Sequence, residues 1–165
     1  MKFTFITVSA PSICCLIKAA REINKLSPGS LDLRLYHAVT EYSREKTERL
    51  ISDIETADMV FVDLMGSPVE TVKAVYNGLE KCGGNVIPYG NSAREYLRIG
   101  DFSAESMKSS GGKKPDMAAM KKMQNMAEAL GKIMPGKMRD MKNYSYICKY
   151  FYVADYSNIL NMLYL

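Results

Sequence analysis

The first hundred residues alternate between short apolar runs and segments in which apolar residues recur every three or four positions. The runs at 2–9, 31–38, 59–65 and 85–89 have the length and composition of strands, and the segments between them have the helical period. Strands that alternate with helices predict an α/β fold. We therefore expect an open parallel four-stranded sheet of Rossmann or flavodoxin type, in the order 2-1-3-4, with additional C-terminal α-helices.

The apolar patterns also predict where the strands lie in the sheet. Residues 59–65 are nearly all apolar, which is typical of a central parallel strand that helices cover on both faces. In 31–38, Leu31, Leu33 and Leu35 alternate with Asp32, Arg34 and Tyr36, which indicates an edge strand with one wetter face.

Two helix starts carry the spacing of a capping box. In Ser67-Pro-Val-Glu70, the serine side chain would accept a hydrogen bond from the Glu70 amide, and Pro68 suits the first helical position. Ser92-Ala-Arg-Glu95 repeats the spacing and predicts a second, shorter helix.

The composition changes beyond Gly100. We expect an α/β unit at 1–100, a flexible loop or linker at 101–114 around Ser109-Ser-Gly-Gly112, and a helical region at 115–165 that packs on the α/β unit. The helical region carries two stripes of apolar residues, Met120, Met123, Ala127, Leu130 and Met134, then Met141, Tyr144, Cys148 and Phe151. The last segment, 156–165, is apolar and its face would need a cover, so we expect a chain truncated from a longer polypeptide.

Composition limits the class of protein. The 165 residues include 47% hydrophobic and 24% charged residues, as in ordinary globular domains, and no apolar run reaches the ~18 residues of a membrane span. The apolar start is too short for a secretory signal. Four cysteines without paired metal-ligand spacing and a single histidine favour a cytoplasmic protein with reduced thiols and no protein-only zinc site.

The formal net charge of +4 falls beyond Gly100, because acidic and basic residues balance before it. Most of the basic residues there cluster between 113 and 142, and these are Lys113, Lys114, Lys121, Lys122, Lys132, Lys137, Arg139 and Lys142. Such a cluster could attract an acidic partner, although a solvated lysine-rich face is the simpler interpretation. Nucleic-acid binding is not expected, because no aromatic residues interleave with the lysines as stacking platforms.

Candidate ligand contacts follow the predicted strands. Ligands of open parallel sheets bind outside the carboxyl ends of the strands, where helix N-termini favour anions. The candidate contacts in these loops are Ser9, Ser12, Gly66, Ser67 and Asn91, although Ser67 also has a structural explanation as a cap. The first loop lacks the glycines of a dinucleotide fingerprint, and Lys113 is not followed by the Ser or Thr of a phosphate loop.

Two further residues have both a functional and a structural interpretation. Asp63 lies in an apolar strand, where a carboxylate is normally paired, hydrogen-bonded or functional, and we favour a structural role. His37 could bind a metal or act as a base, but no second ligand stands near it in the sequence, and an edge histidine is favoured.

Several segments, in this order, resemble the N-terminal part of the large subunit of cobaltochelatase and magnesium chelatase. They are Asp58-Met-Val-Phe-Val-Asp-Leu-Met65 with Gly66-Ser-Pro-Val-Glu70, Gly100-Asp-Phe-Ser103 with Met107, Tyr150-Phe151, and Asn158-Ile-Leu-Asn-Met-Leu-Tyr-Leu165. The resemblance implies a part in ATP-dependent metal insertion into a tetrapyrrole, with cobalt and cobalamin biosynthesis preferred over magnesium. The implied partners are the remainder of the large subunit, AAA+ ATPase subunits and the tetrapyrrole, and the intact complex would use ATP, Mg and cobalt.

The same resemblance places the metal-insertion residues downstream of Leu165. We therefore assign no catalytic residue and no metal ligand to this chain, and expect the isolated chain to bind no cofactor and to be inactive. Two alternatives stay open: a flavodoxin-like domain that binds a phosphorylated small molecule at the strand ends, and a docking module that uses the apolar C-terminal helix.

Overall fold

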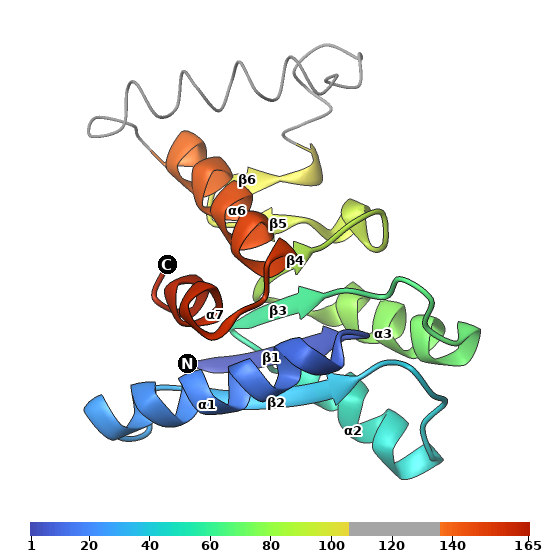
Figure 1. Cartoon of the computed structure of the whole chain (residues 1–165). Helices are drawn as coiled ribbons and strands as arrows, with labels where there is room; N and C mark the ends of the chain where they lie inside the picture. Colours follow the sequence, from blue (N-terminus) through green and yellow to red (C-terminus); the bar gives the residue numbers. More distant parts are fainter. Residues whose placement is uncertain (106–135) are drawn as a thin grey trace.

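The computed structural model describes residues 1–105 and 136–165 (Figure 1). The strands are β1 Lys2–Thr7, β2 Asp32–His37, β3 Met59–Val62, β4 Asn85–Pro88, β5 Arg98–Ile99 and β6 Phe102–Ser103. The helices are α1 Ala10–Leu26, α2 Arg44–Glu55, α3 Val69–Lys81, the 3-10 helix η1 Arg94–Tyr96, α6 Lys137–Tyr152 and α7 Tyr156–Leu163. Most of the expected linker, the first apolar stripe of the helical region, and the lysines from Lys113 to Lys132 lie outside the described residues.

The sheet has six strands in the order β2-β1-β3-β4-β5-β6. β1 pairs in parallel with β2 and β3, and β3 pairs in parallel with β4, whereas β5 and β6 are antiparallel. The α/β class and the open sheet agree with the prediction, but a wholly parallel four-stranded sheet is wrong. The two added strands have only two residues each, which is too short for a periodic pattern, and Gly100 turns the chain between them with φ +52.

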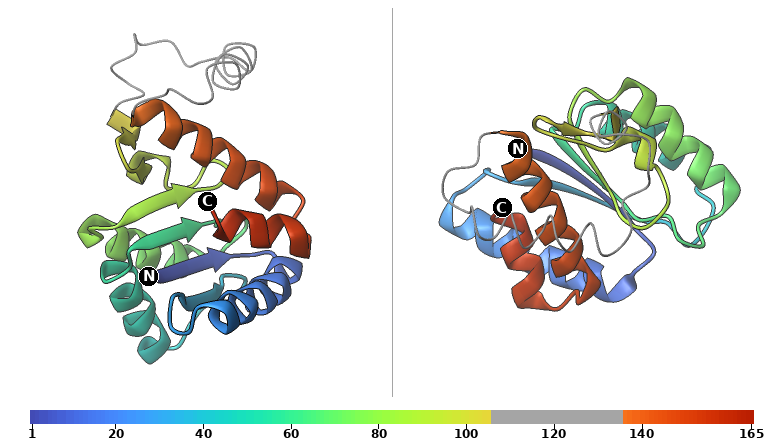
Figure 2. Two further views of the ribbon diagram at one scale, coloured as in Figure 1. Left: turned by 90° about the vertical axis from the view of Figure 1, so that its left-hand side faces the viewer. Right: turned by 90° about the horizontal axis from the view of Figure 1, so that it is seen from above.

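Helices cover both faces of the sheet, as the two views of Figure 2 show. On the first face, α2 and α3 pack against β1, β3 and β4 through a core centred on Leu50, Ile54, Val75 and Val62. On the second face, α1 lies over the β2 side, α6 over the β5 and β6 side, and α7 between them.

Aromatic rings fill the second core. Phe5 of β1 and Phe61 of β3 stack with ring centroids 4.3 Å apart, and Phe151 of α6 lies 4.6 Å from the ring of Phe61. Offset aromatic packing of this kind stabilises a core beyond simple area burial. The C-terminal region is therefore part of the hydrophobic core of the α/β unit.

The apolar face of the last helix is covered within this chain. Ile159 and Met162 of α7 are buried in the core cluster that contains Leu16 and Ala19 of α1. The expectation of an uncovered terminal face is therefore wrong, because α1 leaves the centre of this sheet face free for α7.

Both predicted capping boxes are wrong. α3 begins at Val69 with Pro68 as its N-cap and no side-chain cap, because Ser67 belongs to a turn in which its amide donates to the Leu64 carbonyl at 3.1 Å. η1 begins after Ala93, which has φ 58, and the Ala93 amide donates to the hydroxyl of Tyr76.

The edge position predicted for β2 agrees with the sheet order, but its faces differ from the prediction. Tyr36, expected on the wetter face, is buried and donates a hydrogen bond to Asp53 of α2. None of the helices described is long and apolar enough to cross a bilayer.

Candidate functional site at the carboxyl ends of the strands

The chain leaves the neighbouring strands β1 and β3 toward opposite faces of the sheet. After β1 it enters α1 on one face, and after β3 it enters α3 on the other (Figure 1). Such a reversal separates the two loops and leaves room between them, which is where open α/β sheets bind ligands. The loops at 8–9 and 63–68 form this part of the molecule.

A buried carboxylate stands at this point. Asp63 directly follows β3 and is 3% exposed, and it accepts a hydrogen bond of 2.9 Å from the hydroxyl of Thr7 at the end of β1. The Ser9 amide in turn donates to the Thr7 oxygen at 3.0 Å. No ion pair found among the described residues includes Asp63. The carboxylate therefore joins the two loops through one hydroxyl rather than through a cation.

The two predicted contacts after β1 are Ser9 and Ser12, and their environments differ. Ser9 is the N-cap residue of α1, half-buried, and its side chain makes no cap hydrogen bond. Ser12 is fully buried, and its hydroxyl donates to the Ser9 carbonyl at 2.8 Å. Ser9 is thus available beside the free amides of the helix start, whereas Ser12 has no exposed surface.

The predicted contacts in the second loop are Gly66 and Ser67. Gly66 has φ +87, a conformation that glycine adopts readily and other residues rarely do, and open space surrounds the position of a Cβ. The Ser67 hydroxyl is buried and has no hydrogen-bond partner among the described residues. A buried hydroxyl left unpaired costs about 1–3 kcal/mol, and a ligand acceptor would satisfy it once the loop opens enough to expose the oxygen.

Asn91 lies in the third loop, after β4, and is exposed. This loop is held by a hydrogen bond of 2.6 Å from Arg94 Nε to the Gly90 carbonyl. The structure therefore places Ser9, Gly66 and Ser67 in loops that follow adjacent strands, with Asn91 one strand further along.

Thr7 was not among the candidates predicted from the sequence. Parallel pairing of Ile6 with Val62 puts the next residues, Thr7 and Asp63, side by side.

The remaining candidates for chemistry are tied to structural contacts. His37 Nε2 lies 3.3 Å from the Val8 carbonyl. Burial raises the pKa of the Cys148 thiol to about 11, so this thiol is protonated at neutral pH and is a poor nucleophile. Within 1–105 and 136–165, no group of three or more His, Cys, Asp or Glu side chains could hold a metal ion.

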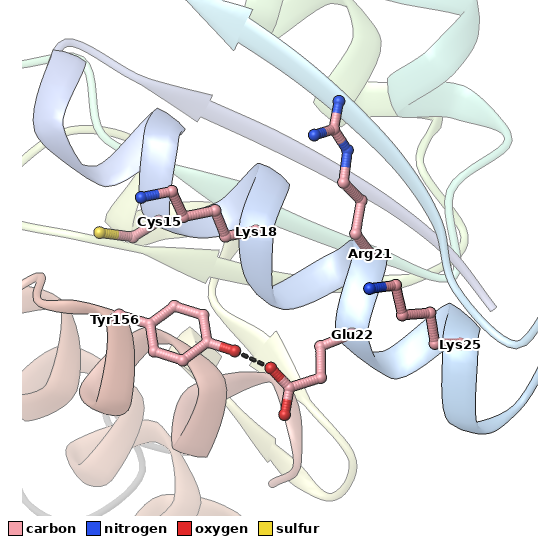
Figure 3. A pocket seen from close by; sticks show the side chains of 6 residues that line it. All are labelled: Cys15, Lys18, Arg21, Glu22, Lys25 and Tyr156. Carbon is pink, nitrogen blue, oxygen red and sulfur yellow. Dashed lines mark hydrogen bonds between the residues drawn. The ribbon is translucent and has the colours of Figure 1, made fainter.

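A second surface carries several basic groups. A groove between α1 and α7 is lined by Cys15, Lys18, Arg21, Glu22, Lys25 and Tyr156 (Figure 3). The Tyr156 hydroxyl donates to Glu22 and ties α7 to α1. The three cations outnumber the single carboxylate, so the groove attracts anions.

Residues 2–145 match the model of a family described as a domain of unknown function, DUF3479. None of the curated proteins compared with the chain matches it.

Proposed function

The chain belongs to this family of domains of unknown function, DUF3479, and we propose that it is the N-terminal module of a cobaltochelatase large subunit. In this proposal the module contributes to metal insertion into a tetrapyrrole and does not catalyse the insertion itself. The remainder of the large subunit and the ATP-hydrolysing subunits supply the catalytic residues.

Two lines of reasoning support the proposal. The ordered segments from Asp58 to Leu165 resemble the chelatase large subunit. Besides the buried carboxylate of Asp63, which the Thr7 hydroxyl binds, the polar groups at the strand ends are hydroxyls, free amides and a glycine turn, and the hydroxyls and amides can donate to an anionic group.

The observation that carries the binding role is the pair of loops at the reversal between β1 and β3. The first amides of α1 and the unpaired Ser67 hydroxyl lie in these neighbouring loops. A tetrapyrrole with carboxylate side chains could place one carboxylate there while its macrocycle packs outside the sheet. We propose Ser9, Gly66 and Ser67 as the contacts, with Asn91 at the margin.

Titration of the chain with uroporphyrin, a polycarboxylate tetrapyrrole, tests this role through the shift of its main absorption band. Ser9→Asp should weaken binding by about tenfold, because it places a negative charge at the helix start. Ser30→Asp, an exposed position after α1 at the opposite end of the sheet, is the matched control and should leave affinity unchanged. A chain that does not shift the band, or a Ser9→Asp variant that binds equally well, would count against the proposal.

The second candidate is a flavodoxin-like domain that binds a phosphorylated small molecule. The same helix start favours it, because free amides at a helix N-terminus bind phosphate. A parallel titration with FMN distinguishes the two: binding of FMN without binding of uroporphyrin favours the second candidate.

A further inference from the structure

The outer edge of β2 is an open edge of the sheet. β2 is the first strand in the sheet order and pairs only with β1. The Asp32 amide donates to the Met1 carbonyl and the Ala38 amide to the Thr7 carbonyl, both at 2.9 Å. Since alternate residues of a strand face the same neighbour, the amides of residues 33, 35 and 37 point away from β1.

These outward amides have no hydrogen-bond partner among the described residues. The strand is also regular, because six consecutive pairs join it to β1 without a bulge, and it contains no proline. Natural edge strands usually carry such interruptions, which prevent pairing with another chain. Here the only charged side chains that β2 itself offers are Asp32 and Arg34, which pair with each other at 2.9 Å.

Both ends of β2 are held in place. The Asn24 side chain makes two hydrogen bonds to the backbone of Leu31, to its carbonyl at 2.7 Å and from its amide at 3.1 Å. At the other end, His37 Nε2 contacts the Val8 carbonyl at 3.3 Å. The edge is therefore ordered before any partner binds, which lowers the entropy cost of pairing.

Two open grooves of about 500 Å³ each flank the edge, one on each face of the sheet. The groove beside α1 is mostly apolar and is lined by Ile17, Leu33 and Leu35, with Arg21 and Lys25 also contributing to it. The groove beside α2 is polar and contains Arg34, Lys46 and Arg49. A strand added to β2 would send alternate side chains into these two different grooves.

The charges around the edge favour an acidic occupant. Arg21 and Lys25 form no ion pair with the described residues, and Nε of Arg34 is buried without an acceptor among them. In the α2 groove, Arg34 pairs with Asp32 at 2.9 Å, and Arg49 lies 4.0 Å from Asp53, which Lys2 also binds at 2.9 Å. Lys46, whose ammonium lies over the Tyr42 ring, forms no ion pair with the described residues. Arg21 and Lys25 on one side of the edge and Lys46 on the other are therefore available to bind carboxylates.

We propose that the edge of β2 is the docking site for an extended acidic segment of a partner protein, which adds to the sheet as a further strand. The partner backbone pairs with residues 33, 35 and 37, its apolar side chains enter the α1 groove, and its carboxylates meet Arg34, Lys46 and Arg49. This surface is separate from the loops assigned above to the tetrapyrrole and does not depend on that assignment.

The first test uses an eight-residue peptide of alternating valine and glutamate and measures amide hydrogen exchange by NMR. Saturation with the peptide should slow exchange at the amides of residues 33, 35 and 37 by about fivefold or more. A peptide of alternating valine and lysine, and a valine-glutamate peptide N-methylated along the edge that faces β2, should each bind at least about tenfold more weakly. The N-methylated peptide tests the backbone pairing without changing the protein.

A charge reversal on α2 provides the second test. Lys46→Glu should weaken binding of the valine-glutamate peptide by about tenfold, because the side chain lines the groove that receives the glutamates. Arg44→Glu is the control on the same helix, since Arg44 is exposed and lines neither groove beside β2, and it should change affinity by less than about threefold.

Three results would overturn the proposal. The first is peptide saturation that leaves exchange at residues 33, 35 and 37 unchanged, and the second is equal affinity for the lysine peptide. The third is concentration-dependent protection of these amides without peptide, which would assign the edge to a second copy of this chain.

Discussion

Two buried aspartates, Asp53 and Asp63, lie in different regions of this molecule and differ in their hydrogen-bond partners. Asp53 of α2 receives hydrogen bonds from Lys2 at 2.9 Å and from the Tyr36 hydroxyl at 2.7 Å. Asp63, at the carboxyl end of β3, has the Thr7 hydroxyl at 2.9 Å and a long contact of 3.5 Å with the Met65 amide. The first carboxylate is satisfied and neutralised by the protein, whereas the second keeps capacity for further partners.

The pKa of Asp53 reflects its environment. Burial alone would raise this pKa, but the hydrogen bonds from Lys2 and Tyr36 outweigh burial and leave it below its ordinary value. A carboxylate held in this way connects α2 to the start of β1 and to β2. The comparison separates a carboxylate that ties three elements together from a carboxylate that joins the two loops at the strand ends.

The largest effect should come from Asp53→Ala. Its loss leaves the buried Tyr36 hydroxyl and the Lys2 ammonium without their acceptor, and we expect the free energy of unfolding to fall by about 3 kcal/mol in urea titrations. Asp32→Ala, which removes only an exposed ion pair with Arg34, should cost less than about 0.5 kcal/mol. Equal losses in the two variants would show that the buried Asp53 contributes no more to stability than the exposed Asp32.

A smaller effect is expected at the other aspartate. Thr7→Val keeps the shape of a fully buried side chain but leaves the Asp63 carboxylate without its hydroxyl donor, and should cost about 1–2 kcal/mol. Thr7→Ser, which keeps the hydroxyl, should lose less than Thr7→Val. The reverse order in chemical denaturation would show that packing, rather than the hydrogen bond, governs this site.

Gly66→Ala tests the loop beside Asp63. Because open space surrounds the Cβ position and φ is +87, only backbone strain acts, and we expect a loss of about 1 kcal/mol in thermal or urea unfolding. Gly83→Ala is the matched control, since its Cβ also meets nothing within 4 Å but its φ lies outside the left-handed region. Equal stability of the two variants would mean that the loop adapts without strain.

The smallest effect should be the dependence of stability on pH. Because the folded pKa of Asp53 is lowered, its contribution is present above the unfolded pKa of about 3.9 and is lost as pH falls through the folded value. Asp53→Asn should therefore flatten the fall in stability below about pH 4.

A second pH effect is expected at Tyr36. Burial, aided by the hydrogen bond to Asp53, raises the pKa of Tyr36, so the contribution of Tyr36 to the free energy of unfolding is lost as pH rises above about 10. Tyr36→Phe should therefore flatten the fall in stability at alkaline pH. Unchanged slopes would place the titrating groups elsewhere.

The sequence predicted the elements that have a strong period. The strands at the centre of the sheet and the helices α1, α2 and α3 follow from runs of apolar residues and from helical spacing, which local sequence contains. The hairpin of β5 and β6 was not predicted, because two-residue strands have no period and are defined by pairing with β4.

The candidate site was predicted only in part. The strand ends were identified because an apolar run that stops before Ser or Gly marks a loop. The hydrogen bond from Thr7 to Asp63 could not be identified from local pattern, because it depends on the register between β1 and β3. The serine caps were wrong because Ser67 lies in a preceding turn and Ala93 takes a left-handed conformation, and both depend on tertiary contacts.

The aromatic core that joins β1, β3 and α6 also constrains how the protein folds during synthesis. Phe61 leaves the ribosome long before Phe151, which covers it, and at about 5–20 residues per second the delay is roughly 5–20 seconds. For that interval, one face of the nascent sheet presents phenylalanine rings to water. This face of the sheet is therefore completed only after α6 has emerged.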